Sequence, residues 1–164
     1  MNLPVGEVLQ QGIAIKEIDT KALTLSLLDK KFSGYLIVTI DGFDGIEEGV
    51  VIFKEGFMMG SFYSYDNYNI NVFGNSALQH SMNALVAEKG VIDIVALSNQ
   101  QIDLVIAFHD KVKITVAIDK RQLDKIFPKS FSQEFAKKVL GEVVKEAESR
   151  KSVFKRLGLS ELGT

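Results

Sequence analysis

The middle of the chain alternates between apolar and polar positions in short runs that turn-forming residues separate. Three segments have the two-residue period of β-strands: 35–40 (YLIVTI), 50–54 (VVIFK) and 57–65 (FMMGSFYSY). The connections between them are too short for a crossover, so an antiparallel meander is predicted. Gly56 suits the tight turn before the third strand, and Gly60 predicts a bulge or a close backbone approach inside it.

Apolar residues at helical spacing predict one helix before this meander and another after it. Asp19 is a natural N-cap for the first helix, which we expect to end near Lys30-Lys31. The polar run after the meander is predicted to be a loop. Asn75 or Ser76 then caps the second helix, which ends at Lys89-Gly90 and is followed by a fourth alternating strand, VIDIVAL.

Residues 98–118 fit two different structures. Ser98 and Gln101 form an S-x-x-Q capping box, which favours a helix to about His109 and then a strand from Val112. The rival interpretation is a hairpin that turns at the sequence HDK, because the residues on both sides of it alternate. The cap favours the helix, and we predict it for 98–109.

A long amphipathic helix is predicted after Pro128, which breaks any element that runs through it. Four apolar residues recur at every fourth position: Phe131, Phe135, Val139 and Val143. Between residues 129 and 156, eight Lys or Arg and four Glu give this segment a net charge of +4. The stripe could pack on its own sheet, pair with a partner or sister helix, or lie on an anionic surface.

These elements predict an α+β fold. We expect an antiparallel meander of about four to five strands packed with helices, plus the long C-terminal helix. Residues 1–127 are predicted to form a single domain and 128–164 the amphipathic helix and tail. A chain of 164 residues is long enough to bury a core without disulfides.

Composition excludes several classes of function. The sequence contains no cysteine, so disulfides, thiolate metal sites and a thiol nucleophile are absent. The net charge of −2 gives no overall attraction to nucleic acid. The N-terminus lacks the pattern of a signal peptide, and no apolar run is long enough to span a membrane. We therefore expect a cytoplasmic protein that binds no nucleic acid.

Candidate catalytic chemistry is sparse. No nucleotide-binding glycine motif and no G-x-S-x-G elbow occurs, and neither His80 nor His109 has a second histidine at helical spacing. If the chain were an enzyme, the candidate catalytic residues would be Asp41, Asp44, His80 and His109. The acidic loop that also contains Glu47 and Glu48 departs from the EF-hand spacing and is predicted to be a solvated turn. We expect no catalysis, no cofactor and no metal.

An aromatic run begins inside the third predicted strand and continues beyond it. Four of its residues are candidates for a protein-binding surface, because exposed aromatic side chains favour interfaces: Phe62, Tyr63, Tyr65 and Tyr68. No basic residue lies between Lys54 and Lys89, which argues against base stacking on these rings. The alternative is a small-molecule pocket beside Gly60, lined by Met58, Met59 and Phe62.

The glycine-containing patterns of the meander resemble a known family. F-S-G-Y-L at 32–36, E-x-G at 47–49 and F-K-E-G at 53–56 are similar to an uncharacterised archaeal family, catalogued only as a domain of unknown function. The order of elements over residues 3–118 also resembles PATAN-type domains of bacterial signalling proteins. That resemblance implies a protein-interaction module, and no catalytic residue is carried over.

The expected function is therefore a non-catalytic interaction or scaffold domain, with a small-molecule-sensing domain as the alternative. The partner is expected to be a protein of unknown identity, or a second copy bound through the C-terminal helix. Phe131, Phe135, Val139 and Val143 would form the helical part of that surface.

Overall fold

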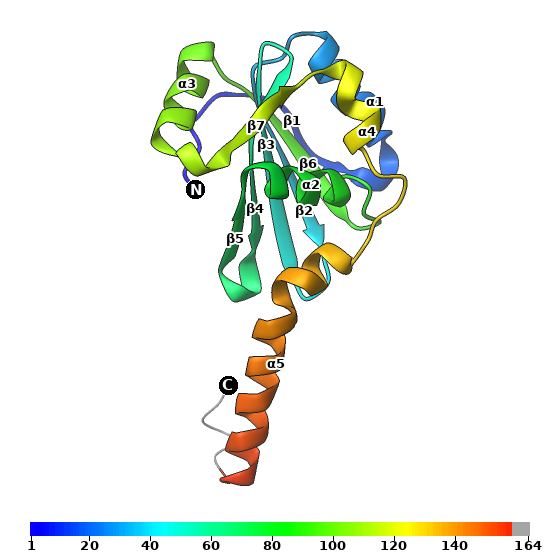
Figure 1. Cartoon of the computed structure of the whole chain (residues 1–164). Coiled ribbons are helices and arrows are strands. Elements are labelled where there is room, and N and C mark those ends of the chain that lie inside the picture. Colours follow the sequence, from blue (N-terminus) through cyan, green and yellow to red (C-terminus); the bar gives the residue numbers. More distant parts are fainter. Residues whose placement is uncertain (159–164) are drawn as a thin grey trace. The chain divides into compact units, whose positions relative to one another are not determined.

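The α+β class expected from the hydrophobic pattern is confirmed (Figure 1). The computed structural model describes residues 1–158, apart from the side chains at positions 142, 144 and 147. The chain divides into two compact units, Met1–Phe131 and a second that begins at Ser132. The tail predicted beyond residue 158 lies outside the described residues.

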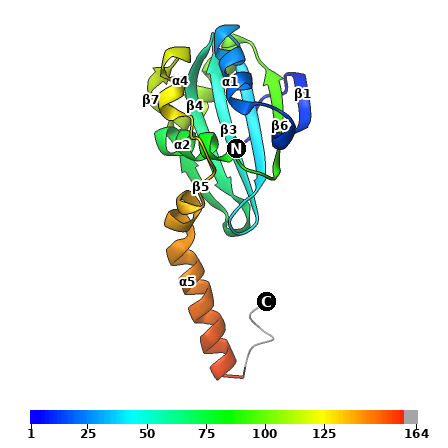
Figure 2. The same cartoon turned by 90° about the vertical axis from the view of Figure 1, so that its right-hand side faces the viewer.

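Within residues 1–158, seven antiparallel strands form a single sheet, which is more than the four to five predicted. They are β1 (Glu7–Ala14), β2 (Gly34–Asp41), β3 (Ile46–Lys54), β4 (Phe57–Tyr65), β5 (Ile70–Phe73), β6 (Gly90–Ala96) and β7 (Lys113–Ile118). Their order is β1-β6-β2-β3-β4-β5, and β7 pairs with the other end of β4. Figure 2 shows β1 beside β6, at the edge of the sheet away from β4 and β7.

The helices and short helical turns connect these strands. The α-helices are α1 (Thr20–Asp29), α2 (Gly74–Ala84), α3 (Asn99–Phe108), α4 (Leu123–Ile126) and α5 (Glu134–Arg156). The 3-10 turns are η1 (Ile15–Glu17), η2 (Asp66–Tyr68), η3 (Asp110–Val112) and η4 (Lys120–Gln122). None of the helices within residues 1–158 is long and apolar enough to cross a membrane.

Two of the helices begin at the side-chain caps that the sequence predicted. The side chain of Asp19 accepts a hydrogen bond from the amide of Ala22, which starts α1. Both bonds of the Ser98–Gln101 capping box are present, so residues 99–108 are a helix and not one arm of a hairpin. Each cap satisfies amides that the first helical turn leaves without a partner.

The predictions around α2 were wrong in three respects. The predicted loop before it contains β5, which pairs with Phe62–Tyr65 of β4. The helix begins at Gly74, without a side-chain cap. It ends at Ala84, because the amides of Val86 and Ala87 bind carbonyls three residues back and tighten the chain into a turn well before Lys89-Gly90.

Two glycines perform the roles that the sequence predicted. Glu55 and Gly56 both have positive φ, 50° and 81°, and make the tight turn between β3 and β4. Gly60 faces Ile52 while Met58 faces Phe53, so Met59 is the extra residue of a bulge. A Cβ on Gly60 would lie 2.9 Å from the carbonyl oxygen of Val112, so the close backbone approach is also real.

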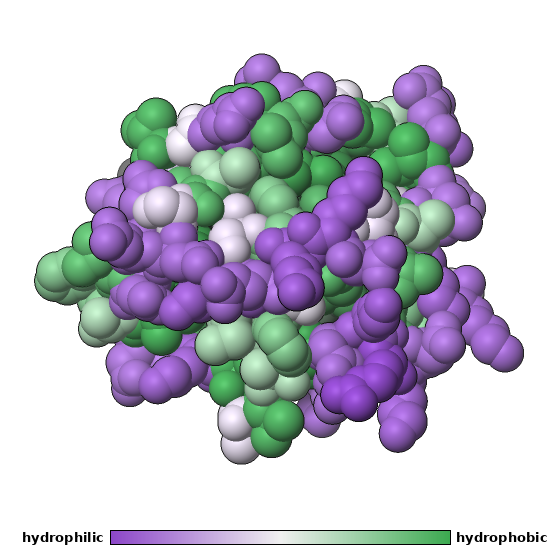
Figure 3. Space-filling view, turned by 90° about the horizontal axis from the view of Figure 1, so that it is seen from above, coloured by the Kyte–Doolittle hydropathy of each residue, from purple (hydrophilic) through white to green (hydrophobic). Residues whose placement is uncertain are grey.

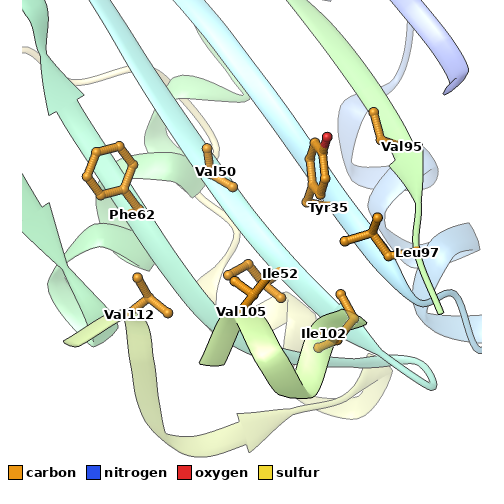
Figure 4. Packing of buried hydrophobic residues seen from close by; sticks show 9 residues of the cluster. All are labelled: Tyr35, Val50, Ile52, Phe62, Val95, Leu97, Ile102, Val105 and Val112. Atoms are coloured by element: carbon orange, nitrogen blue, oxygen red, sulfur yellow. The ribbon is translucent and has the colours of Figure 1, made fainter. Parts of the chain in front are cut away.

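Helices cover both faces of the sheet. α2 packs against β3 and β4 on one face. On the other face, Ile102 and Val105 of α3 pack with side chains of β2, β3, β4 and β6 (Figure 4). Because both faces are covered, the strands are apolar on both sides and alternate only weakly in sequence.

Candidate functional site

A cluster of buried polar side chains lies between the sheet and α2. Glu47 of β3 is almost completely buried. Its Oε2 accepts a hydrogen bond of 2.6 Å from the Tyr63 hydroxyl, and its Oε1 accepts one of 2.9 Å from the amide of Phe43. The carboxylate therefore ties the β2–β3 loop to β4. Each of its oxygens has a donor, as a buried carboxylate requires.

Aromatic rings complete this cluster. The Tyr63 ring lies 5.2 Å from the Tyr65 ring and 5.3 Å from the His80 imidazole of α2, measured between centroids. The Tyr65 hydroxyl is buried and has no hydrogen-bond partner among the described residues. Next to these rings, Ser61 donates a hydrogen bond to the carbonyl of Val50 and lies 3.2 Å from the Ser81 hydroxyl.

Burial controls the titration of these groups. It raises the pKa of Tyr63 far above its ordinary value, and the adjacent Glu47 carboxylate raises it further. The pKa of Tyr65 is raised for the same two reasons. Burial lowers the pKa of His80 to about 4. Near neutral pH the cluster therefore contains two neutral phenols and a neutral imidazole.

The chemistry available to this cluster is structural. Its side chains contact one another and α2, and they line neither the cleft beside α3 nor the one beside the β3–β4 turn. Within the same part of the chain, no group of three or more His, Asp or Glu side chains is placed to hold a metal. The arrangement holds α2 to the sheet and fixes the β2–β3 loop.

We expect acid to destabilise the protein through His80. The unfolded histidine binds a proton near pH 6.5 and the folded one only near pH 4, so between these values the unfolded state holds more protons. The free energy of unfolding should be independent of His80 above pH 6.5 and should fall by about 3 kcal/mol as the pH approaches 4. Urea unfolding of wild type and His80→Gln across this range measures the difference; parallel pH profiles would contradict it.

Three of the predicted interface residues are interior side chains. Tyr63 and Tyr65 lie beneath α2, and Phe62 belongs to the core under α3. They are not available to a partner in this fold, because β4 is paired along both edges and covered on both faces. Tyr68 is half-buried, and its hydroxyl donates to the Asp44 carboxylate.

The remaining predicted residues are distributed over the molecule. Four apolar residues of the predicted helical stripe are half-buried: Phe131, Phe135, Val139 and Val143. Asp41 and Asp44 are exposed in the β2–β3 loop. His80 belongs to α2, on the side that faces the sheet, whereas His109 follows α3 on the opposite face of the sheet. The four candidate catalytic residues, two aspartates and two histidines, therefore do not form one catalytic group.

An exposed apolar surface on α3 was not predicted. Leu104 and Phe108 are 56% and 80% exposed, one helical turn apart. With Leu3 and Pro4 of the N-terminal segment they line an open cleft of about 270 Å³. We call this surface the α3 patch. Figure 3 shows apolar side chains at the left edge of the molecule, the side on which α3 lies in Figure 1.

The space beside Gly60, where a pocket was predicted, is filled by the protein itself. Met58 is fully buried, and the backbone of Val112 occupies the space next to Gly60.

The sequence did contain a signal for the α3 patch, since α3 is apolar on nearly every side and only one side can face the sheet.

Comparison with known proteins identifies a family over two thirds of the chain. A family model described as an uncharacterised protein conserved in archaea (DUF2226) matches residues 1–109. No curated protein matches the chain, and no solved structure does. The resemblance to an uncharacterised archaeal family is thus confirmed, whereas the likeness to PATAN-type domains stays a prediction.

Proposed function

The chain belongs to this archaeal family of uncharacterised proteins (DUF2226), and from that premise we propose that it is a non-catalytic protein-interaction or scaffold domain. The α3 patch is the observation that carries the proposal. Phe108 is 80% exposed beside an exposed Leu. An exposed apolar pair of this kind lowers the solubility of a protein unless another surface covers it. Aromatic and aliphatic anchors of this kind dominate the energetics of protein interfaces.

The proposed docking surface differs from the aromatic run that the sequence favoured. It uses the outer side of α3, whose inner side is held to the sheet by Ile102 and Val105. The capping box at Ser98 fixes the start of this helix. A rigid helix that presents apolar side chains loses little conformational entropy on binding. A cytoplasmic location remains part of the proposal.

The test is the double substitution Leu104→Glu/Phe108→Glu. Both side chains are exposed, so the free energy of unfolding should change by no more than about 0.5 kcal/mol. Proteins that a tagged wild-type chain retains from a lysate of the source organism should be lost, as read by mass spectrometry, because charges oppose burial of the patch.

The matched control is Ala107→Glu, an exposed position of the same helix outside the cleft lining. It should keep whatever wild type retains. The proposal fails if wild type retains no protein above a tag-only control, or if the double variant and wild type retain the same set.

The cleft beside the α3 patch favours a second candidate function, a small-molecule-sensing domain. Its apolar lining carries two polar side chains, Asn2 and His109, which could orient a ligand. A thermal-shift screen of metabolites tests this candidate. A stabilising compound whose effect disappears in Leu104→Glu/Phe108→Glu supports sensing, and a flat response across the screen removes it.

A further inference from the structure

The last two turns of α5 carry an exposed cationic and apolar surface. Four basic side chains lie there, all exposed: Arg150, Lys151, Lys155 and Arg156. Val153 and Leu157 are 47% and 64% exposed and lie one turn apart on the helix. None of the ion pairs found within residues 1–158 involves these four bases. We call this surface the α5 end.

The β2–β3 loop carries an exposed surface that is acidic and apolar. Ile46 is 46% exposed at this loop, and the side chain of Phe43 is also exposed. Around them lie four acids: Asp41, Asp44, Glu48 and Asp66. Lys89 lies beside this loop, where its backbone carbonyl accepts a hydrogen bond from the amide of Asp41. We call this surface the acidic loop.

The acidic loop is held in a fixed shape. Asn67 donates a hydrogen bond of 2.8 Å to the carbonyl of Asp44, and Tyr68 donates to the Asp44 carboxylate. From inside, Glu47 holds the amide of Phe43. Burial and then the Asp66 carboxylate raise the pKa of Glu48; the N-terminal amine opposes this shift, and Asp93 adds a smaller increase. Negative charge is therefore concentrated here, and a cationic partner would relieve it.

We propose that the α5 end of one copy docks on the acidic loop of a second copy, with Val153 and Leu157 against Ile46 and the four bases against the surrounding acids. The exchange is reciprocal, so two such contacts close a two-fold dimer. This inference rests on the proposed function, since it names one partner of the interaction domain.

Charge favours a second copy over an anionic membrane or a nucleic acid. Residues 1–131 contain 12 Lys or Arg and 16 Asp or Glu, a net charge of −4. An anionic surface would attract the α5 end but repel the rest of the chain. A second copy presents acids to the α5 end and bases to the acidic loop, so both charged surfaces are neutralised together.

Charge reversal tests this contact. Lys151→Glu/Lys155→Glu alters the α5 end, and Asp41→Lys/Asp44→Lys alters the acidic loop. Sedimentation equilibrium at low salt should show a wild-type dimer that salt weakens, and each double variant should dimerise about ten-fold more weakly. An equimolar mixture of the two variants should dimerise again. In the mixed dimer the acidic α5 end of one variant meets the basic loop of the other, and the two unaltered surfaces meet each other.

Lys137→Glu/Lys138→Glu, two exposed bases near the start of α5, is the matched control and should leave dimerisation unchanged. A wild-type chain that is monomeric at all concentrations overturns the proposal. So does a mixture that stays as weak as its components. Binding of wild type to vesicles of phosphatidylglycerol, but not of phosphatidylcholine, without any dimer would instead assign the α5 end to anionic lipid. None of these results depends on the α3 patch, so they leave the proposed function to its own test.

Discussion

Replacing Glu47 with leucine is expected to lower the free energy of unfolding by about 3 kcal/mol. The substitution keeps most of the side-chain volume but removes both acceptors of the buried carboxylate. The Tyr63 hydroxyl would lose its partner inside the protein, and the amide of Phe43 would lose the bond that shapes the loop. Urea unfolding followed by circular dichroism measures the loss.

The neighbouring residue supplies the matched control. Glu48→Leu changes the same side chain one position along β3, on the opposite face of the sheet, where it is only half-buried. We expect a change within about 0.5 kcal/mol. If Glu47→Leu and Glu48→Leu lowered the free energy of unfolding equally, the buried hydrogen bonds of Glu47 would make no specific contribution to stability.

A double-mutant cycle separates the hydrogen bond from general packing. Tyr63→Phe removes the donor, and Tyr63→Phe/Glu47→Leu removes donor and acceptor together. Because the double variant leaves no unpaired hydroxyl, its loss should be smaller than the sum of the single losses by at least about 1 kcal/mol. Additive losses would mean that the Tyr63–Glu47 bond has no net effect on stability.

Replacing Gly34 with alanine is expected to cost about 3 kcal/mol or to prevent folding. Gly34 has φ of +152°, a conformation that favours glycine, and it starts β2 between β3 and β6. A Cβ there would lie 2.1 Å from the carbonyl oxygen of Val95 and 2.9 Å from the Cα of Ala96. Both neighbours are backbone atoms of a central strand, so they cannot move aside cheaply.

Gly141→Ala is the control for this substitution. Gly141 lies inside α5, and a Cβ there would meet no atom within 4 Å. Alanine should be neutral or stabilise the helix by up to about 1 kcal/mol. A soluble Gly34→Ala protein that unfolds at the wild-type urea concentration would refute the close approach of β2 and β6.

Several parts of the fold were predictable because their causes are local. The start of α1 depends on Asp19 and that of α3 on Ser98, each within three residues of the amide that it binds. The turn before β4 depends on Gly56, which adopts positive φ without strain. The end of α2 was not predictable from its pattern: the chain tightens into a turn after Ala84, and the Thr20 hydroxyl, from a segment far away in the sequence, donates to the carbonyl of Leu85 there.

The candidate surfaces show the same division. The sequence alone determined the fold class, the absence of thiol chemistry, the segregation of charge between the body and the last helix, and the caps and turns. Only the tertiary structure decided which side chains are exposed. Tyr63 and Tyr65 are interior because α2 covers their face of the sheet, and Phe108 is exposed because α3 can bury only one side. Burial depends on contacts between residues far apart in the chain, and a period of two or 3.6 residues identifies the faces of an element without saying which of them will be covered.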